Sequence, residues 1–171
     1  MSELLSKIIE VPFWEKFANF HGMLAMLALI LFGAAFALLF FSGKISSAVR
    51  TLKIVLAALF VDILLLDIAG LTVYMPYRAA GGPKTVLIGS EETAWLHEII
   101  FEHKEFLAFA PLVLTFAALV VVTKLGDSFG DNEKFKWLRR AVFVALGLSL
   151  IFVLTVAAEA VMVTKAAPVG K

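Results

Sequence analysis

Two of the three histidines in this chain occupy matching positions in separate apolar segments. His21 opens the first long segment and His103 opens the third, and each stands 21 residues before the polar residue that ends its segment. If the segments are the first and third helices of an up-and-down bundle, they run in the same direction, and both imidazoles lie about 31 Å from the far end. Two imidazoles at one depth can hold a haem iron between them. The spacing therefore predicts one bis-histidine haem b per chain.

Basic and aromatic residues near the same end complete this predicted site. Arg78 and Lys104 are candidates to pair with the haem propionates, together with Tyr74 and Tyr77. A second haem would need a fourth imidazole, or a methionine in its place. The candidate methionines are Met23, Met26 and Met75.

His97 is expected to play no part in holding the haem. It lies about 9 Å beyond His103 and is turned about 240° around an α-helix, so it is predicted to be solvated. Five residues separate the two histidines, whereas a zinc metalloprotease helix needs His-Glu-x-x-His with both imidazoles on one face. A zinc site local to this helix is therefore not expected.

The composition places these histidines in a membrane protein. Of 171 residues, 61% are hydrophobic and only 17% are charged, and the mean hydropathy is +0.96. Four segments supply about 20 or more apolar residues, the length that crosses a bilayer, and they lack the alternation of a membrane β-barrel. We predict an all-α, up-and-down bundle of four transmembrane helices in one membrane domain, preceded by a short interfacial helix. The predicted ranges are 1–16 for the interfacial segment and 20–41, 54–75, 95–123 and 141–163 for the spans.

An even number of spans puts both termini on one face of the membrane, here called side A, together with the 76–94 loop. The opposite face, side B, holds the 42–53 and 124–140 loops, which carry eight basic residues in short stretches. Short loops rich in lysine and arginine stay in the cytoplasm. Side B is therefore predicted to be cytoplasmic, and the termini and the histidine end to lie outside a prokaryotic-type plasma membrane.

Several carboxylic acids lie in or beside the predicted spans. Asp62 and Asp67 fall within the second span and Glu159 in the outer part of the fourth, where an ionised side chain costs about 2.5–3.5 kcal/mol at the helix centre. Each is expected to face the bundle interior or a partner subunit, or to be uncharged. Together with Glu102 they form a candidate proton path toward a quinone site on side A.

The composition also excludes several kinds of chemistry. The absence of cysteine excludes disulfides, cysteine-ligated iron–sulfur clusters and covalently attached haem. No tail rich in lysine and arginine is present that would follow nucleic-acid phosphates. No nucleic-acid partner is therefore expected.

The four predicted spans and the pair His21 and His103 resemble the four-helix membrane b-type cytochromes, which pass electrons between quinols and a partner redox subunit. The resemblance covers about residues 20–163. It implies haem b and a quinone as cofactors, membrane or peripheral redox subunits as partners, and electron transfer within an oxidoreductase complex of a respiratory chain. Two other hypotheses stay open. One is a cofactor-free scaffold subunit whose Asp62 and Asp67 face partner helices, and the other is a small proton-coupled transporter that uses Asp62, Asp67 and Glu159.

Overall fold

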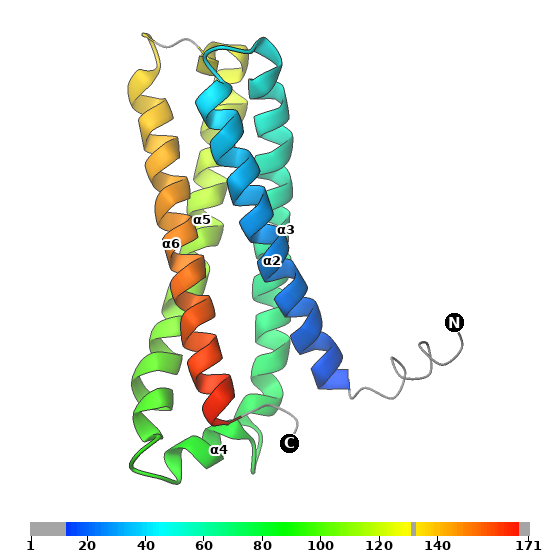
Figure 1. The fold of residues 1–171 in the computed structure, drawn as a ribbon, viewed down its shortest axis with the longest axis vertical. Coiled ribbons are helices and arrows are strands. Elements are labelled where there is room, and N and C mark those ends of the chain that lie inside the picture. The colour runs from blue at the N-terminus through cyan, green and yellow to red at the C-terminus, as the bar shows by residue number, and fades with distance from the viewer. Residues whose placement is uncertain (1–12, 131–132, 168–171) are drawn as a thin grey trace, which may run out of the picture.

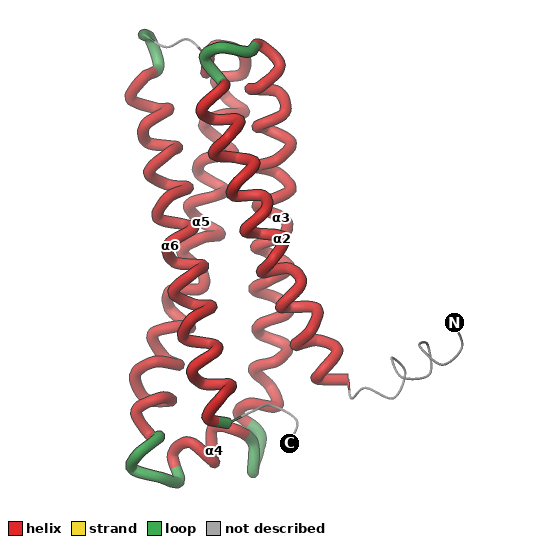
Figure 2. Tube along the Cα trace, in the orientation of Figure 1, coloured by secondary structure: helices red, strands yellow, loops and turns green. Residues whose placement is uncertain are grey.

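Four long helices form an antiparallel up-and-down bundle in the computed structural model, which describes residues 13–130 and 133–167 (Figure 1). The described residues form helices joined by turns, without a strand (Figure 2). The long helices are α2 (Phe13–Phe41), α3 (Ser46–Arg78), α5 (Glu102–Leu125) and α6 (Lys136–Ala166). Three short elements join them: α4 (Pro83–Ile88), the π-helix η1 (Leu96–Phe101) and the 3₁₀-helix η2 (Gly126–Gly130).

All four long helices are long and apolar enough to cross a membrane. α2 has 29 residues and α3 has 33, which correspond to about 43 and 50 Å, whereas the hydrocarbon layer is about 30 Å thick. Their outer faces carry large exposed apolar side chains, including Phe106, Phe40 and Phe116. A surface of this kind is stable against lipid rather than water. The chain is therefore an integral membrane protein of the all-helical class, as its sequence predicts.

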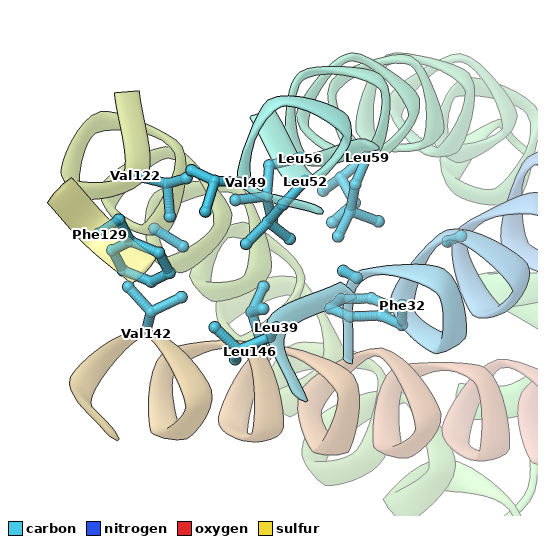
Figure 3. Close-up of a cluster of buried hydrophobic side chains, with 14 of the residues drawn as sticks. Phe32, Leu39, Val49, Leu52, Leu56, Leu59, Val122, Phe129, Val142 and Leu146 are labelled. Carbon is cyan, nitrogen blue, oxygen red and sulfur yellow. The ribbon is translucent and has the colours of Figure 1, made fainter. Parts of the chain in front are cut away.

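The apolar core fills the half of the bundle that faces side B (Figure 3). Phe32 from α2, Leu52 and Leu56 from α3, and Leu146 from α6 are fully buried there. Phe129 of η2 is also fully buried and closes the core at its side-B end. Residues spaced by three, four or seven positions supply these contacts, because that spacing keeps side chains on one helix face.

Packing changes toward side A. No residue of α2 before Leu24 is buried, and α2 packs along α3 for much of its length but only loosely against α6. Figure 1 shows the lower end of α2 leaning away from α6. A second, smaller cluster of buried apolar residues lies at this end, around Tyr77, Leu87 and Phe101. Polar side chains lie beside this second cluster, as His97 does against Tyr77.

The predicted spans lie within the observed helices to within one residue, but two details differ. Pro76 was expected to end the second span, whereas α3 continues through it to Arg78. A proline removes one helical hydrogen bond, and here the buried Tyr77 holds the last turn by stacking on Phe101. The 76–94 connection also contains the helix α4. The predicted interfacial segment 1–16 falls mostly outside the described residues, and its described part, 13–16, begins α2 directly.

Candidate functional site

Polar side chains from all four long helices and η1 gather at the side-A end of the bundle. Hydrogen bonds and ion pairs join most of them, and the charge of Lys104 acts over a longer range on His21, Glu105 and Glu159. We call this group the polar cluster. Its members are His21, Tyr74, Tyr77, Arg78, His97, Glu102, His103, Lys104, Glu105 and Glu159.

His21 is fixed against the backbone of α3. Its Nδ1 lies 3.0 Å from the carbonyl oxygen of Leu66, and because a carbonyl only accepts, Nδ1 is the donor. The ring can reach this carbonyl because Gly70 lies opposite: a Cβ at Gly70 would stand 3.3 Å from Cε1 of His21. The lack of a side chain at one position of α3 therefore sets the orientation of the imidazole on α2.

His103 is fixed by a carboxylate on α6. Its Nδ1 donates to Oε1 of Glu159 at 2.6 Å, a short, charge-assisted hydrogen bond. Glu159 is buried, and its other oxygen, Oε2, has no hydrogen-bond partner within the described part of the chain. The Lys104 ammonium also interacts electrostatically with Glu159. Two positive or proton-donating groups on α5 therefore face one carboxylate on α6.

The two histidines share one arrangement. Each uses Nδ1 to bond an acceptor on a neighbouring helix, a carbonyl for His21 and a carboxylate for His103. Within residues 13–130 and 133–167, neither Nε2 atom makes a hydrogen bond. A histidine that ligates a metal almost always donates its other ring N–H to a carbonyl, a carboxylate or water. The arrangement of both rings is therefore that of an imidazole whose Nε2 is available as a ligand.

The two rings do not contact each other directly. α2 and α5 occupy diagonal positions, with α2 packed on α3 and α5 packed on α6 and α3. His21 accordingly faces α3 and His103 faces α6. Lys104 connects them, because its charge acts on both His21 and Glu159. Their depths match as expected: His21 lies about 30 Å and His103 about 33 Å from the side-B ends of their helices.

The two basic residues predicted to bind propionates have different surroundings. Arg78 is bound by two carboxylates, Glu102 at 3.2 Å and Glu105 at 3.7 Å, and its guanidinium lies over the ring of Tyr74. Lys104 has no ion pair within 4 Å among the described residues, and its ammonium lies 4.7 Å from the centre of the Phe101 ring. Lys104 is therefore the better placed of the two to meet an added anionic group.

The predicted substitute ligands are not in the interior. Met23, Met26 and Met75 are all highly exposed on the outer surface. They therefore cannot supply a sulfur ligand to a haem inside the bundle, and a second haem gains no support from them.

The prediction that His97 is solvated is wrong. The side chain is buried, and its Nδ1 lies 3.0 Å from the hydroxyl oxygen of Tyr77. Its Nε2 lies 3.9 Å from the carboxylate of Glu102, which connects His97 to Arg78. His97 therefore belongs to the polar cluster, although it touches neither His21 nor His103.

The helix type at His97 also differs from the one expected. The expected rotation of 240° assumed α-helical geometry, whereas Leu96–Phe101 form a π-helix, which has more residues in each turn. Leu96, His97 and Phe101 are all buried in this turn. Phe101 stacks on Tyr77 with ring centres 3.9 Å apart and planes 6° apart, which holds the π-helical turn against α3. No signal in the sequence distinguishes this turn from an α-helical one.

The carboxylic acids of the second span remain apart from the polar cluster. Asp62 lies at the middle of α3 and is buried, and neither of its oxygens has a hydrogen-bond partner among the described residues. Oδ2 of Asp67 also lacks a partner there. Of the predicted proton path, the structure thus brings Glu102 and Glu159 into the cluster but gives Asp62 and Asp67 no bonded connection to it.

The described residues contain no group of three or more His, Asp or Glu side chains that is placed to hold a metal ion. The chain itself therefore builds no complete metal site in that region. A haem differs in this respect, because its porphyrin supplies four of the six ligands and the protein supplies only one or two.

No protein-family model, no curated protein and no solved structure matches this chain. The fold and the site define it as a four-helix integral membrane protein with a polar, histidine-containing cluster at one end.

Proposed function

We propose that this chain is a membrane b-type cytochrome subunit, in which His21 and His103 hold one haem and electrons pass between a quinol pool and a partner redox protein. The observation that carries the proposal is the shared arrangement of the two imidazoles. Each is oriented through Nδ1 by an acceptor on the next helix, and each leaves Nε2 without a hydrogen-bond partner in the described chain. The His103 side chain is 54% exposed, so a group that enters beside it can reach the ring.

The residues around the histidines also suit a haem. α2 packs only loosely against α6, and no residue of α2 before Leu24 is buried, so the core is less tightly packed at this end of the bundle than in its side-B half. Gly22, beside His21, has no atom within 4 Å of where a Cβ would stand. Lys104 supplies a positive charge for a propionate. The haem would supply reversible one-electron transfer at its iron.

The residues of the chain would then act in three ways. His21 and His103 would bind, with Leu66 and Glu159 holding their rings in place. Glu159, as a carboxylate, would make the His103 ring the more electron-rich of the two. Arg78 and the acids that surround it would sit at the side-A surface, where protons and partners arrive.

The test is a reduced-minus-oxidised absorbance spectrum of the detergent-purified full chain, produced with ample haem, alongside a pyridine haemochrome assay. We expect a b-type α-band and about one haem per chain. His21→Ala and His103→Ala should each abolish the band. The control is His97→Gln, which keeps a polar group for Tyr77 and should retain the haem. A colourless, folded protein, or equal loss in all three variants, would overturn the proposal.

A second candidate function is proton-coupled transport, and the buried carboxylate oxygens favour it. Glu105 and Glu159 each have one buried oxygen without a partner among the described residues, and both interact with Lys104. Together with Glu102 and His97, they extend from the exposed end of the cluster into the bundle. Proteoliposomes would then show proton flux that Glu159→Gln abolishes. Absence of flux from the unaltered chain would exclude this function, and the same flux from the variant would exclude a role for Glu159.

The scaffold hypothesis expects Asp62 and Asp67 to face partner helices. Asp62 is instead only 4% exposed and faces the interior of its own chain. This observation gives the scaffold hypothesis less support than the other two.

We further propose that side B faces the cytoplasm of a prokaryotic-type plasma membrane, because the side-B loops concentrate the basic residues. The chain has no cysteine, so a single introduced one is a unique label. Ser47→Cys on side B should resist a membrane-impermeant thiol reagent in whole cells, and Ser90→Cys on side A should react with it. The reverse pattern would invert the orientation.

A further inference from the structure

A cavity of about 540 Å³ lies at the side-B end of the bundle, far from the polar cluster. It forms where the turn between α2 and α3 meets η2, and Lys44, Ser47, Arg50 and Asp127 line it. Figure 1 shows these two segments side by side at the upper end of the bundle. Nothing in the proposed cytochrome function uses this cavity.

The walls of the cavity are built into the fold. Phe129 is fully buried in the core and anchors η2 (Figure 3). Gly130 approaches the turn so closely that a Cβ there would stand 2.6 Å from the carbonyl oxygen of Ser42. Only glycine fits this approach. Packing therefore holds the two segments together and fixes these two walls of the cavity.

The charge around the cavity is mainly positive. Lys44 and Arg50 line it, and the Lys53 ammonium lies beside Gly126, at 3.7 Å from where a Cβ would stand. None of these three side chains forms an ion pair with another described residue. Among the described residues of the lining, Asp127 is the one acidic residue. An anionic group would therefore meet two or three uncompensated cations and one carboxylate.

The cavity lies at the membrane boundary. Lys44 follows the end of α2, and its ammonium lies over the ring of Phe40, at 4.7 Å from the ring centre. Phe40, Phe41 and Ile45 are all exposed apolar side chains beside the cavity. A molecule whose charged end sits in the cavity could thus lay an apolar chain along the outer face of α2. A water-soluble phosphate has no apolar chain that could contact such a surface.

We propose that this cavity binds the headgroup of an anionic membrane lipid that carries both a phosphate and free hydroxyl groups, of the glycerol-phosphate kind. Lys44 and Arg50 bind the phosphate, because guanidinium and ammonium groups are strong donors to phosphate oxygens. Asp127 accepts hydrogen bonds from the hydroxyls. A headgroup with a phosphate alone would leave Asp127 repelled by it, so the acid selects for the polyol.

The experiment uses the full chain in nanodiscs of phosphatidylcholine that contain a minor fraction of phosphatidylglycerol or phosphatidate, with retained lipid counted by native mass spectrometry. We expect phosphatidylglycerol to be retained in preference to both other lipids. Lys44→Ala and Arg50→Ala should each weaken its retention about fivefold, the effect of one basic residue near an anionic membrane surface. Asp127→Asn should reduce the preference for phosphatidylglycerol over phosphatidate.

Arg140→Ala is the matched control, since Arg140 is an exposed basic residue on side B that does not line the cavity. Its retention of phosphatidylglycerol should equal that of the unaltered chain. Equal retention of all lipids would show that the cavity selects none of them, and equal weakening by Arg140→Ala and Arg50→Ala would show only general surface charge. Either result would overturn the proposal. Displacement of the lipid by millimolar inorganic phosphate would assign the cavity to free phosphate instead. Circular dichroism of each variant checks that its helices are intact.

Discussion

Gly70 is the position where adding one methyl group tests how His21 is held. Its missing side chain allows the His21 ring to approach the backbone of α3 and to donate to the Leu66 carbonyl. In Gly70→Ala, the new Cβ would lie 3.3 Å from Cε1 and 3.7 Å from Nδ1 of His21. Carbon atoms pack best at about 3.5–4.0 Å, so the ring must move by a few tenths of an ångström. That movement strains the hydrogen bond to Leu66.

Two opposing contributions to the free energy of unfolding set the size of the effect of Gly70→Ala. Replacing glycine by alanine within a helix stabilises it by about 0.5–1 kcal/mol. Weakening or losing the hydrogen bond from His21 costs about 0.5–1.5 kcal/mol. The net change in the free energy of unfolding should therefore be close to zero. The control is Gly33→Ala in α2, where a Cβ meets no atom within 4 Å and only the stabilising term remains.

The assay compares thermal unfolding of both variants in detergent, and follows His21 by NMR of protein labelled with nitrogen-15 at histidine. Gly33→Ala should be more stable than Gly70→Ala by about 1 kcal/mol, and only Gly70→Ala should shift the His21 signals. If haem is bound, Gly70→Ala should also lower its occupancy. Equal stabilisation by both variants, with unchanged His21 signals, would refute the claim that Gly70 positions the imidazole.

Three further substitutions test other parts of the structure. Tyr77→Phe removes the partner of a buried ring nitrogen of His97 and should lower the free energy of unfolding by about 1–3 kcal/mol; unchanged thermal stability would mean that this hydrogen bond is not made. Phe129→Ala opens a space in the side-B core and should cost about 3–5 kcal/mol in the same measurement, and a loss below about 1 kcal/mol would contradict the anchoring of η2. Asp62→Asn removes an ionisable group whose oxygens have no partner among the described residues, so chemical unfolding in detergent should show equal or greater stability. A clear loss of stability in Asp62→Asn would instead show that the carboxylate binds a charged partner.

The four-helix architecture could be predicted from the sequence, because the length of each apolar segment decides it. Each of the four apolar segments is long enough to cross the bilayer, and a helix is the way for one segment to satisfy its own backbone in lipid. The ends of the helices were less predictable. Proline was expected to stop α3 at residue 76, but the stacking of Tyr77 on Phe101 outweighs one missing hydrogen bond. The energy that decides such an end comes from a residue on another helix.

The candidate site, too, could be predicted only in part. That His21 and His103 lie at matching depths follows from counting residues along straight helices, since each residue adds a constant rise. Which group each imidazole bonds does not follow from counting. It depends on which faces of α2, α3, α5 and α6 meet, and only the packed bundle puts Gly70 behind one ring and Glu159 beside the other.

His97 shows most clearly what could not be predicted from the sequence. Its sequence position is compatible with exposure under α-helical rotation, yet it is buried against Tyr77, within the π-helix η1. A π-helical turn is less stable than an α-helical one in isolation, so it forms where tertiary contacts compensate for it. The spans, their number and the shared end of the three histidines follow from the amino-acid sequence. The tertiary structure alone decided which polar groups touch, because hydrogen bonds depend on tenths of an ångström that hydrophobicity does not specify.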